Sequence, residues 1–176
     1  MTYVSPNITR EQWDSGKKTD MDVFENQLDG WLFKQAKALV KRKQAGPAIL
    51  ALVTPYFEVI ESYIRGKPSK DQSSKFLKAG LREVFPNVDS KAISKYAVEI
   101  RHGFAHEAMF RRVALHHGDA TVPTFGVVNG ILHVDPWWIL ETADRHFKAY
   151  VATLRAGNDP ALLKSWRRFM NYRKQR

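Results

Sequence analysis

Residues 47–64, with the sequence PAILALVTPYFEVIESYI, decide the fold of this chain. Apolar residues recur along them at steps of three and four positions, which is the period of one face of an α-helix. The positions that this period turns inward are Ile49, Leu52, Val53, Tyr56, Phe57, Ile60 and Ile64. Gly46 and Pro47 break the preceding pattern, and Pro47 is placed to open the helix. Pro55 lies inside the helix and should kink it.

The same period extends on both sides of this helix. Before it, an apolar stripe runs from Asp20 to about Lys43 through Met21, Phe24, Leu28, Trp31, Leu32 and Leu39. After it, Ser69 and Gln72 have the spacing of a capping box for a third helix that reaches Phe85. A fourth helix, capped by Asp89 or Ser90, carries Ile93, Tyr96, Ala97, Ile100 and Phe104 on one face. These patterns predict a mainly α-helical protein.

The pattern changes to an alternating one near Val127. Val127-Val128, Asn129-Gly130 and residues 131–134 give the signal of a two-residue β-hairpin. Asp135-Pro136 and Asp159-Pro160 then each combine a cap with a proline at the first helical position, so two further helices follow. We therefore expect a mainly α fold, a helical bundle of five to six helices with one inserted β-hairpin. Residues 1–176 form one domain, with an irregular lead-in over 1–19 and a basic C-terminal helix over 159–176.

Composition limits the class of protein. The chain has 176 residues, of which 44% are hydrophobic and 26% charged, which is globular composition. It has no cysteine, which excludes a disulfide-stapled scaffold and any Cys-ligated zinc site. Neither a signal peptide nor an apolar stretch long enough for a bilayer stands out, so we expect a cytoplasmic protein without membrane contact. The net charge of +10 favours a polyanionic partner such as nucleic acid.

One short segment carries groups suited to catalysis. Residues 98–110 read VEIRHGFAHEAMF and place Arg101, His102 and His106 within six positions at the end of the fourth helix. On a regular helix His102 and His106 are about 40° apart, whereas Arg101 and His106 are about 140° apart. Histidine transfers protons near neutral pH, and arginine is a permanently charged, bidentate ligand for phosphate. This set fits cleavage of RNA by its own 2′-hydroxyl, and it requires no metal or cofactor.

The segment resembles the HEPN superfamily, because Arg101 to His106 matches its Arg-x4-His motif and a polar residue, His102, directly follows the arginine. The resemblance implies a small helical bundle, over about residues 20–156, that acts as a metal-independent endoribonuclease in toxin, antiviral-defence or stress-response roles. It implies Arg101 and His106 as catalytic residues, with His102 in support. It also implies a homodimer with the two motifs facing one cleft, and a protein antitoxin or regulator as a further partner. One subgroup has a tyrosine target for its antitoxin two residues after the histidine, where this chain has Ala108.

Basic side chains outside the motif are candidates for contact with the RNA backbone. They are Arg111, Arg112, Lys164, Arg167 and Arg168, the last three on the C-terminal helix. The other reading of that helix is a docked element with a solvated basic face. Trp137 and Trp138 are expected in the core and at a dimer contact.

Two other functions remain open. The first is a non-catalytic module of the same fold that binds RNA, a nucleotide or a protein partner. The second is a metal-dependent hydrolase built on His102 and His106, with a third ligand from Glu107, His116 or His117. The absence of cysteine and of a paired Asp/Glu motif counts against a metal site.

Overall fold

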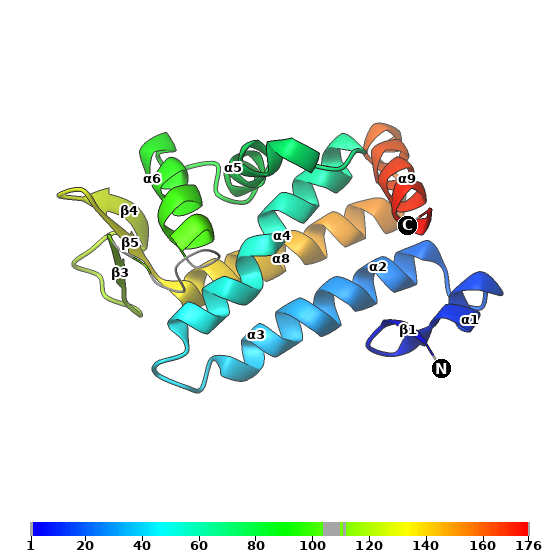
Figure 1. Ribbon diagram of the computed structural model, residues 1–176, viewed down its shortest axis with the longest axis horizontal. Helices are drawn as coiled ribbons and strands as arrows, with labels where there is room; N and C mark the ends of the chain where they lie inside the picture. The colour runs from blue at the N-terminus through cyan, green and yellow to red at the C-terminus, as the bar shows by residue number, and fades with distance from the viewer. Residues whose placement is uncertain (1, 104–109, 111, 176) are drawn as a thin grey trace.

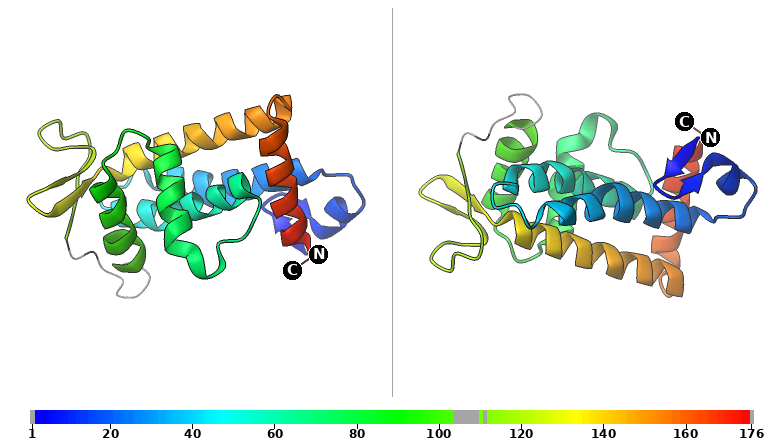
Figure 2. Two further views of the ribbon diagram at one scale, coloured as in Figure 1. Left: turned by 90° about the horizontal axis from the view of Figure 1, so that it is seen from above. Right: turned by 90° about the horizontal axis from the view of Figure 1, so that it is seen from below.

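A computed structural model describes residues 2–103, 110 and 112–175 of the chain. The protein is mainly helical, as predicted, and its helices pack around one apolar core (Figure 1). A three-stranded sheet lies at one end of the long axis, and helix α9 lies at the other end together with both chain termini (Figures 1 and 2).

Helix α4, Gly46–Arg65, is the centre of the core. Of the positions predicted to face inward, Ile49, Val53, Tyr56, Phe57 and Ile60 are buried, together with Leu50 and Tyr63. The helix contacts α5, α8 and α9, and it ends at Gly66 in a left-handed conformation with φ of 66°. It is one helix of 20 residues with a mean hydropathy of 1.2, enough by length and composition to cross a membrane. However, 56% of that stretch is buried inside the protein, as in a core helix.

The predicted helix from Asp20 is a rod of three parts. Helix α2 spans Asp20–Leu28, η1 spans Asp29–Phe33 and α3 spans Lys34–Leu39. The η1 part is a π-helical turn, which holds one more residue than an α-helical turn and so changes which side chains face the core. Phe33 is therefore buried, while Trp31, expected on the inward stripe, is 50% exposed.

Helix α5, Ser73–Val84, crosses α4 at very short range. Gly80 permits this contact, since a Cβ there would lie 1.8 Å from the carbonyl oxygen of Phe57. The predicted capping box at Ser69 is wrong. The Ser69 hydroxyl donates to Glu58 instead, and a short 3₁₀ turn, η2 (Lys70–Gln72), leads into α5 without a side-chain cap.

The fourth helical segment consists of α6, Ser90–Lys95, and a second π-helical turn, η3, Tyr96–His102. Its predicted cap is confirmed, because the Asp89 carboxylate accepts a hydrogen bond from the Lys91 amide. The predicted inward residues Ile93, Tyr96, Ala97 and Ile100 are buried. Phe104 lies outside the described residues.

The predicted hairpin is confirmed. Strands β4 (Phe125–Val128) and β5 (Ile131–Val134) pair antiparallel around Asn129 and Gly130, both with positive φ. A third strand, β3 (Val113–Leu115), pairs parallel to β5 and was not predicted, because three residues are too few to show an alternating pattern. The sheet order is therefore β3-β5-β4.

Ordered elements also occupy the segment that was expected to be irregular. Strands β1 (Tyr3–Ser5) and β2 (Ile8–Thr9) pair antiparallel, and helix α1 spans Arg10–Asp14. This segment packs on α2, where the Gln27 side chain donates a 2.6 Å hydrogen bond to the Val4 carbonyl. Val4, Ile8 and Val23 form a small separate apolar cluster. The period was missed because these elements are only two to five residues long.

Both proline-marked helices begin where predicted. Helix α8 spans Pro136–Ala156 with Asp135 as its cap, and α9 spans Pro160–Lys174 with Asp159 as its cap. Helix α9 lies across the end of α4, where a Cβ on Gly66 would be 2.9 Å from the Ser165 carbonyl oxygen. Trp138 stacks on Phe85 with ring centres 5.1 Å apart, in agreement with its expected place in the core.

Candidate functional site

Arg101, one of the predicted catalytic residues, lies within the described part of the chain. It lies near the end of η3, and the buried side chains of Tyr96 and Ile100 fix this turn to the core. Its guanidinium Nη2 donates a 2.6 Å hydrogen bond to the Ser73 hydroxyl and lies 3.7 Å from the Glu58 carboxylate. The arginine side chain remains 31% exposed. It is thus held by two other helices and still reaches solvent.

Glu58 is the hub of the contacts around Arg101. Its carboxylate accepts hydrogen bonds of 2.5 Å from the hydroxyls of Ser69 and Ser73, one on each oxygen. These contacts join the middle of α4 to the loop before α5 and to the first residue of α5. The negative charge of this carboxylate, 3.7 Å from the guanidinium, offsets part of the positive charge of Arg101. Sequence reasoning missed Glu58, which is 43 positions from Arg101 and has no motif around it.

The rest of the motif is only partly described. His102 is the last residue of η3 and is half-buried, whereas His106 and Arg111 lie outside the described residues. The separation of about 140° assumes a regular helix, and η3 does not have that geometry up to His102. The relation of Arg101 to His106 therefore stays a prediction.

The residues considered as metal ligands have other contacts. His117 lies 3.5 Å from the Asp135 carboxylate and against the Trp137 ring, and the His116 Nε2 lies 3.2 Å from the Pro123 carbonyl. Within residues 2–103, 110 and 112–175, no three His, Cys, Asp or Glu side chains are placed to hold a metal ion. Glu107 lies outside those residues.

The predicted RNA-backbone residues fall into two separate regions. Lys164, Arg167 and Arg168 are exposed on α9, within an arc of about 100°. Arg112 precedes β3, and its carbonyl accepts a hydrogen bond from the Leu132 amide of β5. Because the sheet and α9 lie at opposite ends of the molecule, Arg112 does not share one basic face with the three α9 residues (Figures 1 and 2). Contact of these residues with the RNA backbone stays a prediction.

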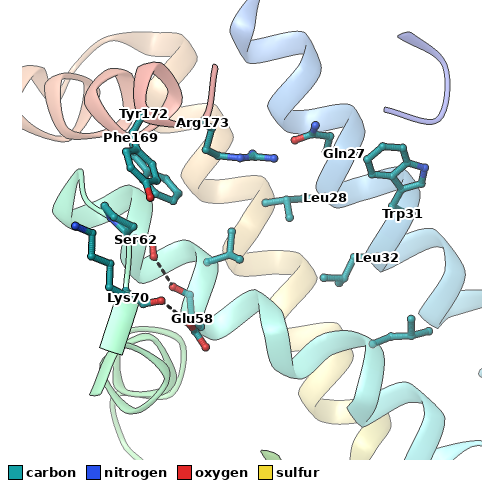
Figure 3. A pocket seen from close by; sticks show the side chains of 14 residues that line it. Gln27, Leu28, Trp31, Leu32, Glu58, Ser62, Lys70, Phe169, Tyr172 and Arg173 are labelled. Carbon is teal, nitrogen blue, oxygen red and sulfur yellow. Dashed lines mark hydrogen bonds between the residues drawn. The ribbon is translucent and has the colours of Figure 1, made fainter. Parts of the chain in front are cut away.

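A groove of about 730 Å³ opens beside Glu58, and it was not predicted from the sequence. Its walls come from α2 and η1 on one side and from α9 on the other, with α4 between them (Figure 3). Its lining residues are Gln27, Leu28, Trp31, Leu32, Leu52, Glu58, Val59, Ser62, Pro68, Ser69, Lys70, Phe169, Tyr172 and Arg173. Three distant segments of chain meet here, so no local pattern could have indicated it.

A row of polar side chains on α4, α8 and α5 runs from the buried Tyr56 to the exposed Glu83. The Tyr56 hydroxyl and the His146 Nδ1 are 2.7 Å apart, and the His146 Nε2 lies 3.8 Å from the Glu83 carboxylate. Burial lowers the pKa of His146, against the opposing effect of Glu83. Burial also raises the pKa of Tyr56 well above its ordinary value. Burial of His146 beside Tyr56 therefore favours a neutral histidine in the folded protein.

Comparisons with protein families, curated proteins and solved structures found no match to this chain. The chemistry of the Arg101 site therefore carries the functional argument.

Proposed function

We propose that the chain is a metal-independent endoribonuclease of HEPN type, in which Arg101 binds the scissile phosphate. The observation that carries this proposal is the setting of Arg101. Its guanidinium is held by Ser73 and Glu58, remains partly exposed and lies on a π-helical turn. Such turns inside α-helices occur frequently at functional sites. The net charge of +10 supports a polyanionic substrate.

The reaction needs a base, an acid and a positive charge. The base takes the proton of the 2′-hydroxyl, whose oxygen forms a bond to phosphorus while the bond from phosphorus to the 5′-oxygen breaks. The acid gives a proton to that leaving oxygen, so that the products are a 2′,3′-cyclic phosphate and a 5′-hydroxyl. His106 is proposed for proton transfer, His102 for its support, and Arg101 for the charge on the equatorial oxygens.

The fold proposed with this activity is a HEPN-type helical bundle with the hairpin inserted before α8. We place it in the cytoplasm, in toxin, antiviral-defence or stress-response duty, with a protein antitoxin or regulator as partner. A homodimer would bring two motifs to one cleft. Exposed apolar residues support an interface at η3 and the hairpin, namely Val98, Val128 and Ile131.

A second candidate is a non-catalytic RNA-binding module of the same fold. The contact that favours it is the one between Glu58 and Arg101, since a carboxylate there competes with phosphate for the guanidinium. Such a module would bind RNA without changing it.

The test is RNA cleavage in excess chelator, with analysis of product ends. We expect cleavage to persist and to leave cyclic phosphate and 5′-hydroxyl ends. Arg101→Ala and His106→Ala should each reduce it by about 10²-fold or more. Arg145→Ala, an exposed arginine on α8, is the control with the same charge change. RNA binding without cleavage would support the module instead, and cleavage restored only by a divalent ion would contradict the proposal.

A further inference from the structure

The groove beside Glu58 has aromatic rings on both of its long walls. Trp31 stands on the η1 wall and is 50% exposed, which is uncommon for so large an apolar side chain. On the α9 wall, Phe169 and Tyr172 stack with ring centres 5.9 Å apart and planes 13° apart. Figure 3 shows these rings on opposite sides of the opening. Phe169 is buried beneath the stack, whereas Trp31 and Tyr172 are exposed in whole or in part. Flat, exposed rings like these two are the platforms on which unpaired bases stack.

Positive charge accompanies the rings. Arg173 extends from α9 across the groove toward Gln27, and its Nη1 donates a 2.5 Å hydrogen bond to the Tyr63 hydroxyl (Figure 3). Neither Arg173 nor Lys70 has an ion pair with a carboxylate of the described residues. The described lining carries one carboxylate, Glu58, whose oxygens are engaged by Ser69, Ser73 and Arg101. The groove is therefore suited to an anion.

The groove continues past the loop before α5. A second hollow of about 360 Å³ shares Pro68, Ser69, Lys70 and Tyr172 with it and adds Lys67 and Arg168. The positive lining thus extends along a path rather than ending in one pocket. A continuous charged path fits a chain of phosphates better than a single small ligand.

We infer that this groove binds single-stranded RNA, with bases stacked on Trp31 and Tyr172 and with phosphate at Arg173 and Lys70. The inference deepens the proposed function and rests on RNA as its ligand. Glu58 lines the groove and also touches Arg101, so a strand in the groove passes one side chain away from the proposed phosphate site. Its volume of about 730 Å³ lies within the range of about 300–1,000 Å³ typical of ligand sites.

The experiment measures fluorescence anisotropy of a labelled single-stranded RNA of about twelve nucleotides. Its riboses carry 2′-O-methyl groups, which block cleavage and so separate binding from catalysis. Trp31→Ala should weaken binding about tenfold, and Trp31→Phe should restore most of it, because a phenyl ring still stacks. Arg173→Gln should weaken binding and lower the slope of log affinity against log salt by about 0.7.

Matched controls are available outside the groove. Tyr3→Ala removes an aromatic side chain of similar exposure, and Arg145→Gln removes the same charge as Arg173→Gln. Both should bind within about twofold of the wild type, while all variants keep their melting temperature within a few degrees. A duplex of the same sequence should bind more weakly, because its bases are not free to stack on the rings.

The outcomes separate this inference from the proposed function. Equal RNA affinity of the wild type, Trp31→Ala and Arg173→Gln would contradict the inference that the groove binds RNA. It would leave the proposed cleavage at Arg101 unaffected. No binding of the single strand by the wild type would also overturn the inference. A dimer that dissociates in Trp31→Ala, with unchanged RNA affinity, would make the groove a self-association surface and contradict the inference. Groove-dependent binding without cleavage of unmodified RNA would sustain the inference and remove the proposed catalysis.

Discussion

Glu58 determines how much of the Arg101 charge a ligand can use. Its carboxylate is held by two serine hydroxyls, so it stays beside the guanidinium instead of turning into solvent. A phosphate that binds Arg101 must therefore compete with it. Substitution by glutamine keeps an acceptor for one serine hydroxyl, places an NH2 donor beside the other, and removes the negative charge.

Glu58→Gln should therefore bind RNA more tightly than the wild type, by about threefold to tenfold, with a salt dependence steeper by about one phosphate contact. The same change at Glu141, an exposed glutamate on α8, alters the net charge equally and serves as the control. Anisotropy titrations between about 50 and 200 mM salt measure both quantities. If the two variants gain the same affinity, the effect is one of net charge and Arg101 has no special part in it.

His146 links stability to pH. Its pKa is lowered by burial from its ordinary value of 6.5, so the folded protein takes up this proton less readily than the unfolded chain. The stability that this histidine contributes is thus present above that value and lost as the pH falls below it. The carboxyl groups of Asp22, Asp135 and Asp144, whose pKa values are lowered by hydrogen bonds and neighbouring cations, act in the same direction but in a separate, more acidic window.

His146→Gln should flatten the decrease in melting temperature between about pH 7.5 and 5.5, because glutamine keeps a partner for the Tyr56 hydroxyl but does not titrate. Thermal unfolding across this range, followed by circular dichroism, measures the slope. His133→Gln, on β5, removes a histidine from another part of the fold and is the control. An unchanged slope in His146→Gln would show that this site does not control the response.

At the scale of elements, helix propensity and packing predict opposite effects of Gly80→Ala on the stability of the protein. By propensity alone, alanine in place of glycine within a helix adds about 1 kcal/mol of stability. Here the new Cβ would lie 1.8 Å from the Phe57 carbonyl oxygen, so α5 would have to move away from α4. We expect Gly80→Ala to destabilise the protein by about 2–3 kcal/mol, since rigid backbone rather than a side chain blocks the methyl group.

Denaturant unfolding measures this change, and Ala79→Gly gives the propensity effect of the neighbouring position on the same helix. That control should cost about 1 kcal/mol. A gain of stability in Gly80→Ala would mean that the two helices do not approach as closely as described.

The sequence was sufficient wherever an element is long and its ends carry a specific residue type. Asp89, Asp135 and Asp159 each accept the amide hydrogen bonds predicted for a helix cap, and Asn129-Gly130 forms the predicted turn. It was not sufficient for Ser69, whose hydroxyl has a distant partner, Glu58, that no local spacing reveals. The same reason applies to the groove, since its walls are assembled from three separate segments.

The π-helical turns caused a different error in the prediction of which residues face the core. A calculation at about 100° per residue cannot include an extra residue in a turn, so it placed Trp31 on the inward stripe and Phe33 off it. The same assumption entered the angle between Arg101 and His106. The candidate arginine was found because its motif depends on spacing in sequence, not on the helix geometry.

At the scale of the whole molecule, we predict a homodimer whose interface includes η3 and the hairpin. Val98 on η3 is 57% exposed, and Val128 and Ile131 are exposed beside the hairpin turn. Val98→Asp should shift the protein to monomer at micromolar concentration and reduce cleavage, because a buried unpaired carboxylate is costly at an interface. Light scattering and cleavage are measured on the same samples.

Tyr3→Asp is the control, since it places the same charge on an exposed residue at the opposite end of the molecule (Figure 1). It should remain dimeric and active. A wild-type protein that is monomeric and fully active would contradict the dimer and the shared cleft together.

The two π-helical turns also have a consequence for the evolution of this protein. Each is equivalent to one residue inserted into an α-helix, and one carries Trp31 while the other carries Arg101. A homologous sequence without the insertion would align with a single-residue gap within 29–33 or 96–102. Such a gap would mark a lineage in which the tryptophan turns into the core or the arginine leaves its serine and glutamate partners. The two gaps, scored independently across an alignment, would show whether the groove and the arginine site were gained and lost together.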